Sequence, residues 1–301
     1  MKKFIVKILI FSTVFFLFDK LFYIFLDLSP KQEVDKRLDF VINGNMNKDL
    51  IIIGSSRGAR DLIAKQVEDS LNISCYNLSY PGSNIDFHLF LLKCLIKHNK
   101  NPKSIILVLD ERTQLVTAKN MGFRFDRLYP LSKYNYINEE LIKRKEKNLL
   151  SRFLFLSRIN KSNLDIRKKK FTEKDSLRIC GSMPINSKLK SNLNYKNELN
   201  YNLNNESNEL NKAFREFQEI CTKNKIQLFL VFPPNYKKIN SLFKKRIIEI
   251  SKVETKFIEY DTSKFNEKSI NYFYDQSHLN INGARIFTND VIKKIKMNVI
   301  E

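Results

Sequence analysis

Tryptophan is absent from this 301-residue chain, and glycine, cysteine and histidine are scarce, with 7, 4 and 3 copies. Four cysteines are too few for a disulfide framework in a chain of this length, and they lack the closely spaced pairs of a zinc site. Cys75 and Cys94 fall inside apolar patterns, which predicts small core residues. A disulfide between Cys180 and Cys221 is compatible with a compartment outside the cytoplasm, but no feature of the sequence requires it.

Acidic residues are also in short supply, because 32 Asp and Glu face 53 Lys and Arg and leave a net charge of +21. Such a charge suits nucleic acid, anionic lipid headgroups or an acidic polymer as a neighbour, and charge alone does not choose among them. The basic residues are densest at 143–147, 167–170 and 237–246, without a zinc-finger, RNP-type or glycine-lysine-rich signature. We therefore predict no nucleic-acid partner.

The N-terminal segment is the one long apolar stretch. Residues 4–26 carry only Lys7, Asp19 and Lys20 as charges, and about 20 apolar residues suffice to cross a bilayer as a helix. No small-x-small cleavage site follows, which favours an uncleaved signal anchor at residues 1–27. The lysines that precede the span predict a single-pass protein with a cytoplasmic N-terminus and an extracytoplasmic remainder. An interfacial amphipathic helix, or a tilted span in which Lys20 snorkels, is the alternative.

The rest of the chain alternates short apolar runs with helical periodicity, which is typical of βαβ units. After a linker at 28–48, the pattern predicts an α/β domain at 49–301, built as three α/β/α layers around a central parallel sheet of about five strands. The predicted strands are 50–53, 75–78, 105–109, 228–232 and 257–260. Residues 111–210 exceed an ordinary connection and predict an insertion. This insertion either caps the active face or is a surface addition without a role.

Unusual residues follow the predicted strands, where an open parallel sheet binds its ligands. The first strand runs into Gly54-Ser55-Ser56-Arg57-Gly58, and a serine on the first turn of a helix there has an exposed hydroxyl beside backbone N–H groups. A serine nucleophile needs a base, and the chain offers His88, His98 and His278. His278 is the best candidate, because Asp275 lies three residues earlier and is able to hold the imidazole tautomer.

These segments resemble two sequence blocks of the SGNH/GDSL hydrolase family. Ile53-Gly54-Ser55-Ser56 is similar to the first block, and Asp275-Gln276-Ser277-His278-Leu279-Asn280 with Gly283-Ala284 is similar to the last. The resemblance implies Ser56 as nucleophile, His278 as base and Asp275 as its partner. It also implies that Gly82 gives an N–H to the oxyanion hole. It covers residues 49–110 and 226–301.

Two departures from the family pattern stand out. Ser55 replaces the usual aspartate, as in a membrane-anchored branch concerned with D-alanyl transfer and polysaccharide O-acetylation. The third block has no match, since the third strand runs into Asp110-Glu111-Arg112 and supplies no oxyanion asparagine. Asn84 or the Ser56 amide is then expected to take that place, and Arg57 is a candidate for binding an anionic substrate.

The resulting hypothesis is an extracytoplasmic serine-dependent esterase or O-acyltransferase that acts on a cell-surface or exported glycan. Its expected partners are an acylated glycan or lipid-linked sugar, the membrane and a membrane-bound acyltransferase, and it needs no cofactor or metal. The first alternative is a catalytically inactive glycan-binding or assembly protein, which the missing third block favours. The second alternative, a basic binder of nucleic acid or of a membrane surface, explains the charge but not the placement of Ser56 and His278.

Overall fold

The computed structural model describes residues 1–28, 36–164, 177–187, 193, 201–236 and 240–299. The chain forms two compact units, one made of residues 1–39 with 124–170 and one made of 40–123 with 171–301. The basic run at 167–170, residues 237–239 of the run at 237–246 and residues 29–35 of the predicted linker at 28–48 lie outside the described residues.

The larger unit is built on a five-stranded, all-parallel sheet with the order β2-β1-β3-β4-β5. The α/β fold and the parallel sheet predicted from the apolar runs are thereby confirmed. The strands are β1 (Leu50–Ile53), β2 (Cys75–Asn77), β3 (Ser104–Val108), β4 (Gln227–Val231) and β5 (Lys256–Ile258). With this order the chain reverses direction across the sheet between β1 and β3, which is where such sheets form a ligand crevice.

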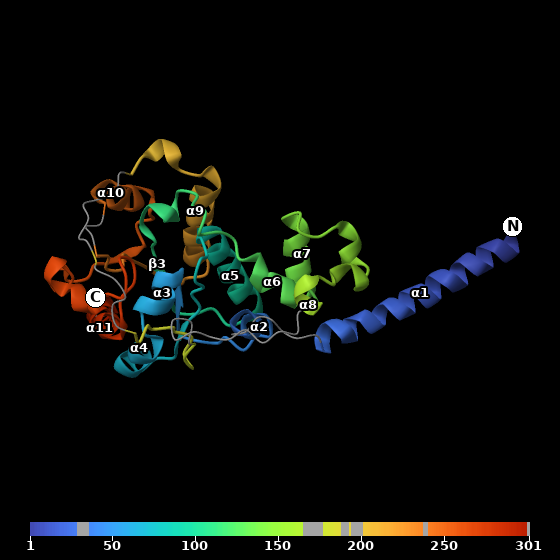
Figure 1. The fold of residues 1–301 in the computed structure, drawn as a ribbon, viewed down its shortest axis with the longest axis horizontal. Helices are drawn as coiled ribbons and strands as arrows, with labels where there is room; N and C mark the ends of the chain where they lie inside the picture. Colours follow the sequence, from blue (N-terminus) through green and yellow to red (C-terminus); the bar gives the residue numbers. More distant parts are fainter. Residues whose placement is uncertain (29–35, 165–176, 188–192, 194–200, 237–239, 300–301) are drawn as a thin grey trace. The chain divides into compact units, whose positions relative to one another are not determined.

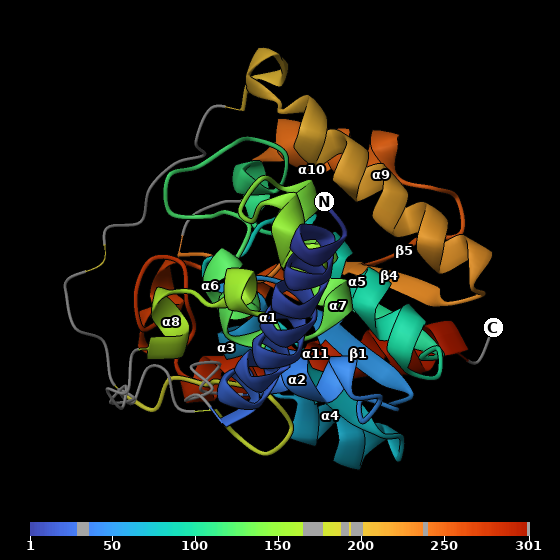
Figure 2. The same cartoon turned by 90° about the vertical axis from the view of Figure 1, so that its right-hand side faces the viewer.

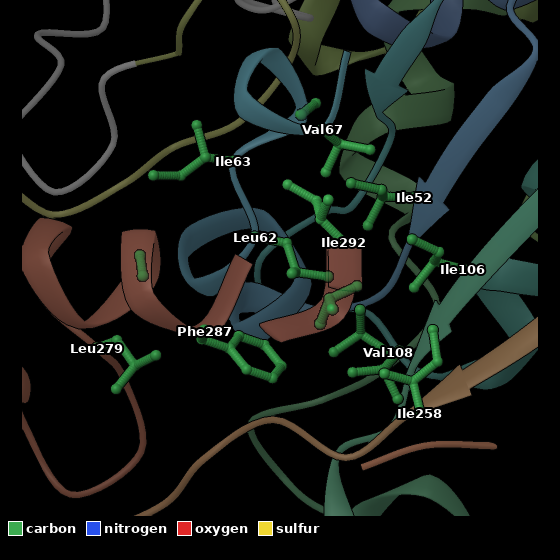
Figure 3. Packing of buried hydrophobic residues seen from close by; sticks show 14 of the residues in the cluster. Ile52, Leu62, Ile63, Val67, Ile106, Val108, Ile258, Leu279, Phe287 and Ile292 are labelled. Atoms are coloured by element: carbon green, nitrogen blue, oxygen red, sulfur yellow. The ribbon is translucent and has the colours of Figure 1, made fainter. Parts of the chain in front are cut away.

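Helices cover both faces of the sheet, as the continuously apolar strands require. Successive side chains of a strand point to opposite faces, and in β1 all four residues are buried. Ile52, Ile106 and Val108 enter a core that includes Phe287, on the face covered by α4 and α11 (Figure 3). The helices of this unit are α3 (Ser56–Asp61), α4 (Ala64–Leu71), α5 (Ile85–His98), α9 (Asn208–Lys223), α10 (Ser241–Ile250) and α11 (Ile281–Val299), with the 3₁₀ turns η1 (Glu111–Gln114), η6 (Leu203–Asn205), η7 (Thr262–Lys264) and η8 (Glu267–Tyr272).

The second unit is helical. It contains the N-terminal helix α1 (Lys2–Leu28), which is long and apolar enough to cross a membrane (Figure 1). Its other elements are α6 (Phe125–Leu128), α7 (Asn135–Lys143), α8 (Lys161–Leu164) and the 3₁₀ turns η2 (Tyr129–Leu131), η3 (Leu149–Arg152) and η4 (Leu156–Arg158). The short helix α2 (Arg37–Ile42) spans the boundary of the two units.

The predicted insertion at 111–210 is thus divided between the two units. Residues 124–170 belong with α1, whereas residues 182–185 return to the α/β unit. There the Met183 amide donates to the carbonyl oxygen of Ala59, and the Ser182 hydroxyl donates to that of Leu62. All four cysteines are free thiols; Cys180 is half-buried and the others are buried.

Candidate active site

The candidate site is a cavity at the carboxyl ends of β1, β3 and β4. Its volume is about 590 Å³, and its walls come from the ends of these strands, the loop at 116–121 and the loop before α11. Polar side chains dominate the wall next to the sheet: Ser55, Ser56, Arg57, Asp110, Asn235 and His278. Figure 2 shows α9 beside α5 and β4, with which it packs in the α/β unit.

Ser56 begins α3 directly after β1, and its side chain is half-buried in the cavity wall. The preceding residue, Ser55, is the N-cap, and its hydroxyl oxygen accepts a hydrogen bond from the Arg57 amide at 3.4 Å. Gly58 lets α3 lie close to Ser79, in the segment after β2, because a Cβ at position 58 would stand 2.5 Å from Ser79 Oγ. The glycine two residues after Ser56 therefore brings the nucleophile candidate down onto the sheet edge.

His278 lies within hydrogen-bond reach of Ser56. The distance from Ser56 Oγ to His278 Nε2 is 2.8 Å, and His278 Nδ1 stands 2.9 Å from Asp275 Oδ1. With the Nδ1 proton directed at the carboxylate, Nε2 remains as the acceptor for the serine hydroxyl. The structure therefore brings together the three side chains that the sequence analysis grouped as nucleophile, base and orienting acid.

The loop that carries His278 is fixed by its own backbone. Asp275 Oδ1 accepts hydrogen bonds from the amides of Ser277 and His278, both at 2.9 Å. The next amide, that of Leu279, donates to Asp61 Oδ1 at 3.0 Å, which ties the loop to the end of α3. The loop that carries His278 is thus attached to the helix that begins with Ser56.

Asn280 and Gly283, a polar and a glycine position of the segment 275–284, form the start of α11. The Asn280 side chain accepts from the Gly283 amide at 3.1 Å and so caps the helix. A Cβ at Gly283 would stand 2.3 Å from the Tyr272 carbonyl oxygen, so that any larger residue would displace the end of η8 from the start of α11. Asn280 and Gly283 therefore help to position the segment that carries His278, although neither of them lines the cavity.

Two arginines, Arg57 and Arg60, and the buried carboxyl group of Asp61 influence the surroundings of His278. Burial lowers the pKa of His278 below 6.5; Asp275 opposes this change, whereas Arg60 and Arg57 add to it. Arg60 Nη1 lies 3.4 Å from His278 Nε2, which favours a ring whose Nε2 carries a lone pair. Burial also raises the pKa of Asp61 well above 3.8, although both arginines act in the opposite direction. A neutral imidazole at neutral pH is what a general base requires.

Asp110, at the end of β3, is a second unusual acid. Its side chain is 6 % exposed, and burial raises its pKa to about 6 despite the charge of Arg57 and a hydrogen bond from Ser55. The Ser55 hydroxyl donates to Asp110 Oδ1 at 2.6 Å, and within the described chain Oδ2 has no hydrogen-bond partner. Ser55, which stands where the resembled family has aspartate, is therefore bound to a carboxyl from the neighbouring strand.

Three further residues proposed from the sequence have other surroundings. Gly82 and Asn84 are not among the residues that line the cavity. The Asn84 side chain accepts from the Phe87 amide at 3.2 Å and serves as the N-cap of α5. Arg57 does line the cavity, but the residue is only 6 % exposed, and its guanidinium donates to the carbonyl oxygens of Pro233 and Pro234 at 2.5 and 3.1 Å.

Asn235 is a cavity residue that the sequence analysis did not select. It is 3 % exposed, and its Oδ1 has no hydrogen-bond partner among the described residues. Its backbone is held from both sides, since Arg57 binds the two preceding carbonyl groups and the Tyr236 amide donates to Gln276 O at 3.0 Å. The backbone on either side of Asn235 is thereby held between Arg57 and the loop that carries His278. The only sequence signal was its place after the fourth strand.

The described residues contain no group of three or more His, Cys, Asp and Glu side chains arranged to hold a metal ion. The arrangement that is present, a hydroxyl bound to an imidazole that is bound to a carboxylate, is the one used for nucleophilic acyl transfer. Comparison with protein-family models and with curated proteins finds no match to this chain.

Proposed function

We propose that this protein is a membrane-anchored, serine-dependent esterase or O-acyltransferase that acts on acylated glycans outside the cytoplasm. The observation that carries the proposal is the pair of contacts at 2.8 and 2.9 Å that link Ser56, His278 and Asp275. Ser56 and His278 are 222 positions apart in the chain, and both line the same cavity.

In the proposed reaction Ser56 Oγ attacks the ester carbonyl carbon while His278 Nε2 takes its proton. Collapse of the tetrahedral intermediate expels the alcohol, which receives that proton from His278, and leaves an acyl-serine. Water or a sugar hydroxyl then attacks the acyl group, and His278 again moves the proton. Asp275 keeps the imidazole in the required tautomer and stabilises its charged form.

The tetrahedral oxyanion needs hydrogen-bond donors. The Ser56 amide at the start of α3 remains our first choice, and Gly82 remains a sequence-based prediction. For the second donor we propose Asn235 in place of Asn84, because Asn235 lines the cavity whereas Asn84 caps α5 and does not line it. Asn235 lines the cavity and its carboxamide carries an Nδ2 donor, so that this side chain is our candidate to replace the asparagine of the missing third block.

The second candidate is an inactive glycan-binding or assembly protein of the same fold. Its support is the absence of a donor asparagine after β3 and the mixed charges of the cavity, Arg57 and Lys119 against Asp110 and Glu111. The extracytoplasmic location, the glycan and a membrane-bound acyltransferase as partner belong to the proposal and rest on α1 and on the family resemblance.

Labelling of the full-length protein in detergent with a fluorophosphonate probe tests the proposal. The active enzyme reacts at Ser56, and we expect Ser56→Ala to abolish the label. Ser241→Ala is the matched control, since Ser241 is an exposed serine at the start of another helix, α10. A folded wild-type protein that neither labels nor hydrolyses p-nitrophenyl acetate would favour the inactive protein instead.

A further inference from the structure

The helical unit exposes a cluster of large apolar side chains outside α1. Leu149, Leu150, Phe153 and Leu156 have exposed fractions of 63, 59, 65 and 43 %. They lie on and between η3 and η4, and we call them the 149–156 patch. Single exposed apolar residues are ordinary, but a contiguous group marks a surface that binds a partner or a membrane.

The patch is held against the C-terminal half of α1. Both carboxylate oxygens of Asp19 accept backbone hydrogen bonds there, from the amides of Phe155 at 2.8 Å and Leu156 at 2.9 Å. The Tyr23 ring packs on the edge of Phe155 at 5.2 Å between centroids. Asp19 is 1 % exposed, so that its charge is satisfied by the backbone at the start of η4.

This contact fixes the height of the patch along α1. Residues 4–18 form the apolar part of the helix, in which Lys7 is the only charged residue. At 1.5 Å per residue this part is about 22 Å long. That length is somewhat shorter than a hydrocarbon core of about 30 Å, a difference that local thinning or snorkelling lysines accommodate. Asp19 and Lys20 then lie at the edge of the hydrocarbon, and the 149–156 patch lies beside them.

The charge of this part of the chain suits the same position. Residues 124–164 contain ten Lys and Arg against four Asp and Glu, a difference of +6 out of the +21 of the whole chain. Lys143 and Lys145, just before the patch, are exposed. Apolar side chains flanked by lysine and arginine are the composition of segments that bind anionic membrane surfaces.

We propose that the 149–156 patch is a membrane-interface element, whose apolar side chains enter the acyl-chain boundary of an anionic bilayer beside the span of α1. This inference rests on α1 acting as the membrane anchor of the proposed function. It assigns exposed lysines beside the patch to lipid headgroups, and it makes the Asp19 contact a joint that keeps the 149–156 patch at the bilayer surface.

The absence of tryptophan gives a direct test, because one introduced tryptophan is the only indole in the protein. Full-length Phe153→Trp is reconstituted into phosphatidylcholine–phosphatidylglycerol vesicles that contain lipids brominated at known depths. We expect blue-shifted emission and loss of most of the fluorescence with bromine near the headgroup end of the acyl chain. The matched control is Leu242→Trp on α10, a leucine 60 % exposed, which we expect to emit as in water without quenching.

A third reporter separates this inference from the anchor on which it rests. Phe11→Trp, in the middle of α1 and 71 % exposed, is expected to be quenched by deep bromines. Quenching at residue 11 without quenching at residue 153 would overturn the interface element alone, and blue-shifted but unquenched emission at residue 153 would show that protein covers the patch instead. No quenching at residue 11 would remove the anchor and the inference together. Equal quenching of Phe153→Trp in vesicles of phosphatidylcholine alone would remove the role of the lysines and arginines.

Discussion

The hydroxyl oxygen of Ser56 lies 2.8 Å from Nε2 of His278, a residue 222 positions away in the chain. The contact forms because the first strand of the α/β unit and the loop before its last helix end at the same edge of the sheet. Asp61 reinforces it by holding the Leu279 amide at 3.0 Å. This relationship makes the candidate site sensitive to small changes in the loop at 275–279.

The carboxylate of Asp275 is expected to matter through the tautomer of His278. Asp275→Asn keeps a backbone acceptor for the loop but no longer favours the proton on Nδ1, and we expect kcat/KM for p-nitrophenyl acetate to fall by about 10³ to 10⁴-fold. Asp261→Asn is the matched control, because Asp261 Oδ1 also accepts a backbone amide, that of Ser263, on an exposed turn. A loss of less than about tenfold in Asp275→Asn would mean that the carboxylate does not orient the base.

The pH dependence of activity should report the environment of His278. Because burial lowers its pKa, the neutral base persists below pH 6.5, and we expect the acid limb of kcat/KM to have its midpoint below that value. Arg60→Gln removes a nearby positive charge that also lowers this pKa, so that the midpoint should move upward. Initial rates across the range from pH 4 to 8 check both expectations. An acid limb centred above pH 6.5 in the wild type would exclude His278 as the titrating base.

Asp110 should make the fold less stable as pH rises. Its folded pKa of about 6 exceeds its ordinary value of 3.8, so that the folded state binds this proton more tightly than the unfolded state does. The resulting penalty is absent below pH 3.8, grows between 3.8 and 6, and reaches up to about 3 kcal/mol above that range. Asp110→Asn carries no such charge, and we expect it to be more stable than the wild type at pH 8 and about equal to it near pH 4.

Thermal unfolding of the full chain in detergent measures this difference. Asp49→Asn provides a control of opposite sign, because hydrogen bonds from Ser74 and Lys103 lower the Asp49 pKa to about 2. That carboxylate stabilises the fold above its ordinary pKa, and its replacement should lower the unfolding temperature at pH 8. If Asp110→Asn behaves like Asp49→Asn at pH 8, the carboxylate of Asp110 is paired rather than penalised by burial.

Asn235 should contribute to the rate and little to the fold. We expect Asn235→Ala to lower kcat by about 10² to 10³-fold, the usual loss when one oxyanion donor is removed, with a smaller change in KM. Asn235→Asp keeps the shape and removes the Nδ2 donor, and should lose as much. Asn282→Ala, an exposed asparagine in the first turn of α11, serves as the control. Wild-type kcat in Asn235→Ala would exclude Asn235 as the second oxyanion donor and leave the Gly82 amide as the candidate.

Much of the fold follows from local patterns. The strand predictions at 50–53, 105–109 and 228–232 match β1, β3 and β4 to within one residue at each end, because a short, wholly apolar run between turns has few alternatives to a buried strand. For two reasons, the sequence alone was enough to predict that Ser56 and His278 lie together. Strand ends meet at one edge of a parallel sheet, and only three histidines had to be considered.

Burial of polar groups was harder to predict, since it depends on partners that are distant in the chain. Asn235 is enclosed by Arg57 from α3 and by the backbone at Gln276, neither of which is visible from its neighbours. Asn84 shows the opposite case. An asparagine three residues before Phe87 at the start of an amphipathic helix is a common N-cap pattern, and this local role holds Asn84 at the start of α5, outside the lining of the cavity.

The return of residues 182–185 to the α/β unit sets a limit on how this protein can be shortened. The amide of Ala64 donates to Ser182 Oγ, and the amide of Ile281 donates to the Ile185 carbonyl oxygen, so that this segment braces the helix after Ser56 and the helix after His278 at once. A deletion that removes 111–210 as one block would take this brace with it. A shortened form that omits residues 124–164 would still have to retain residues 182–185.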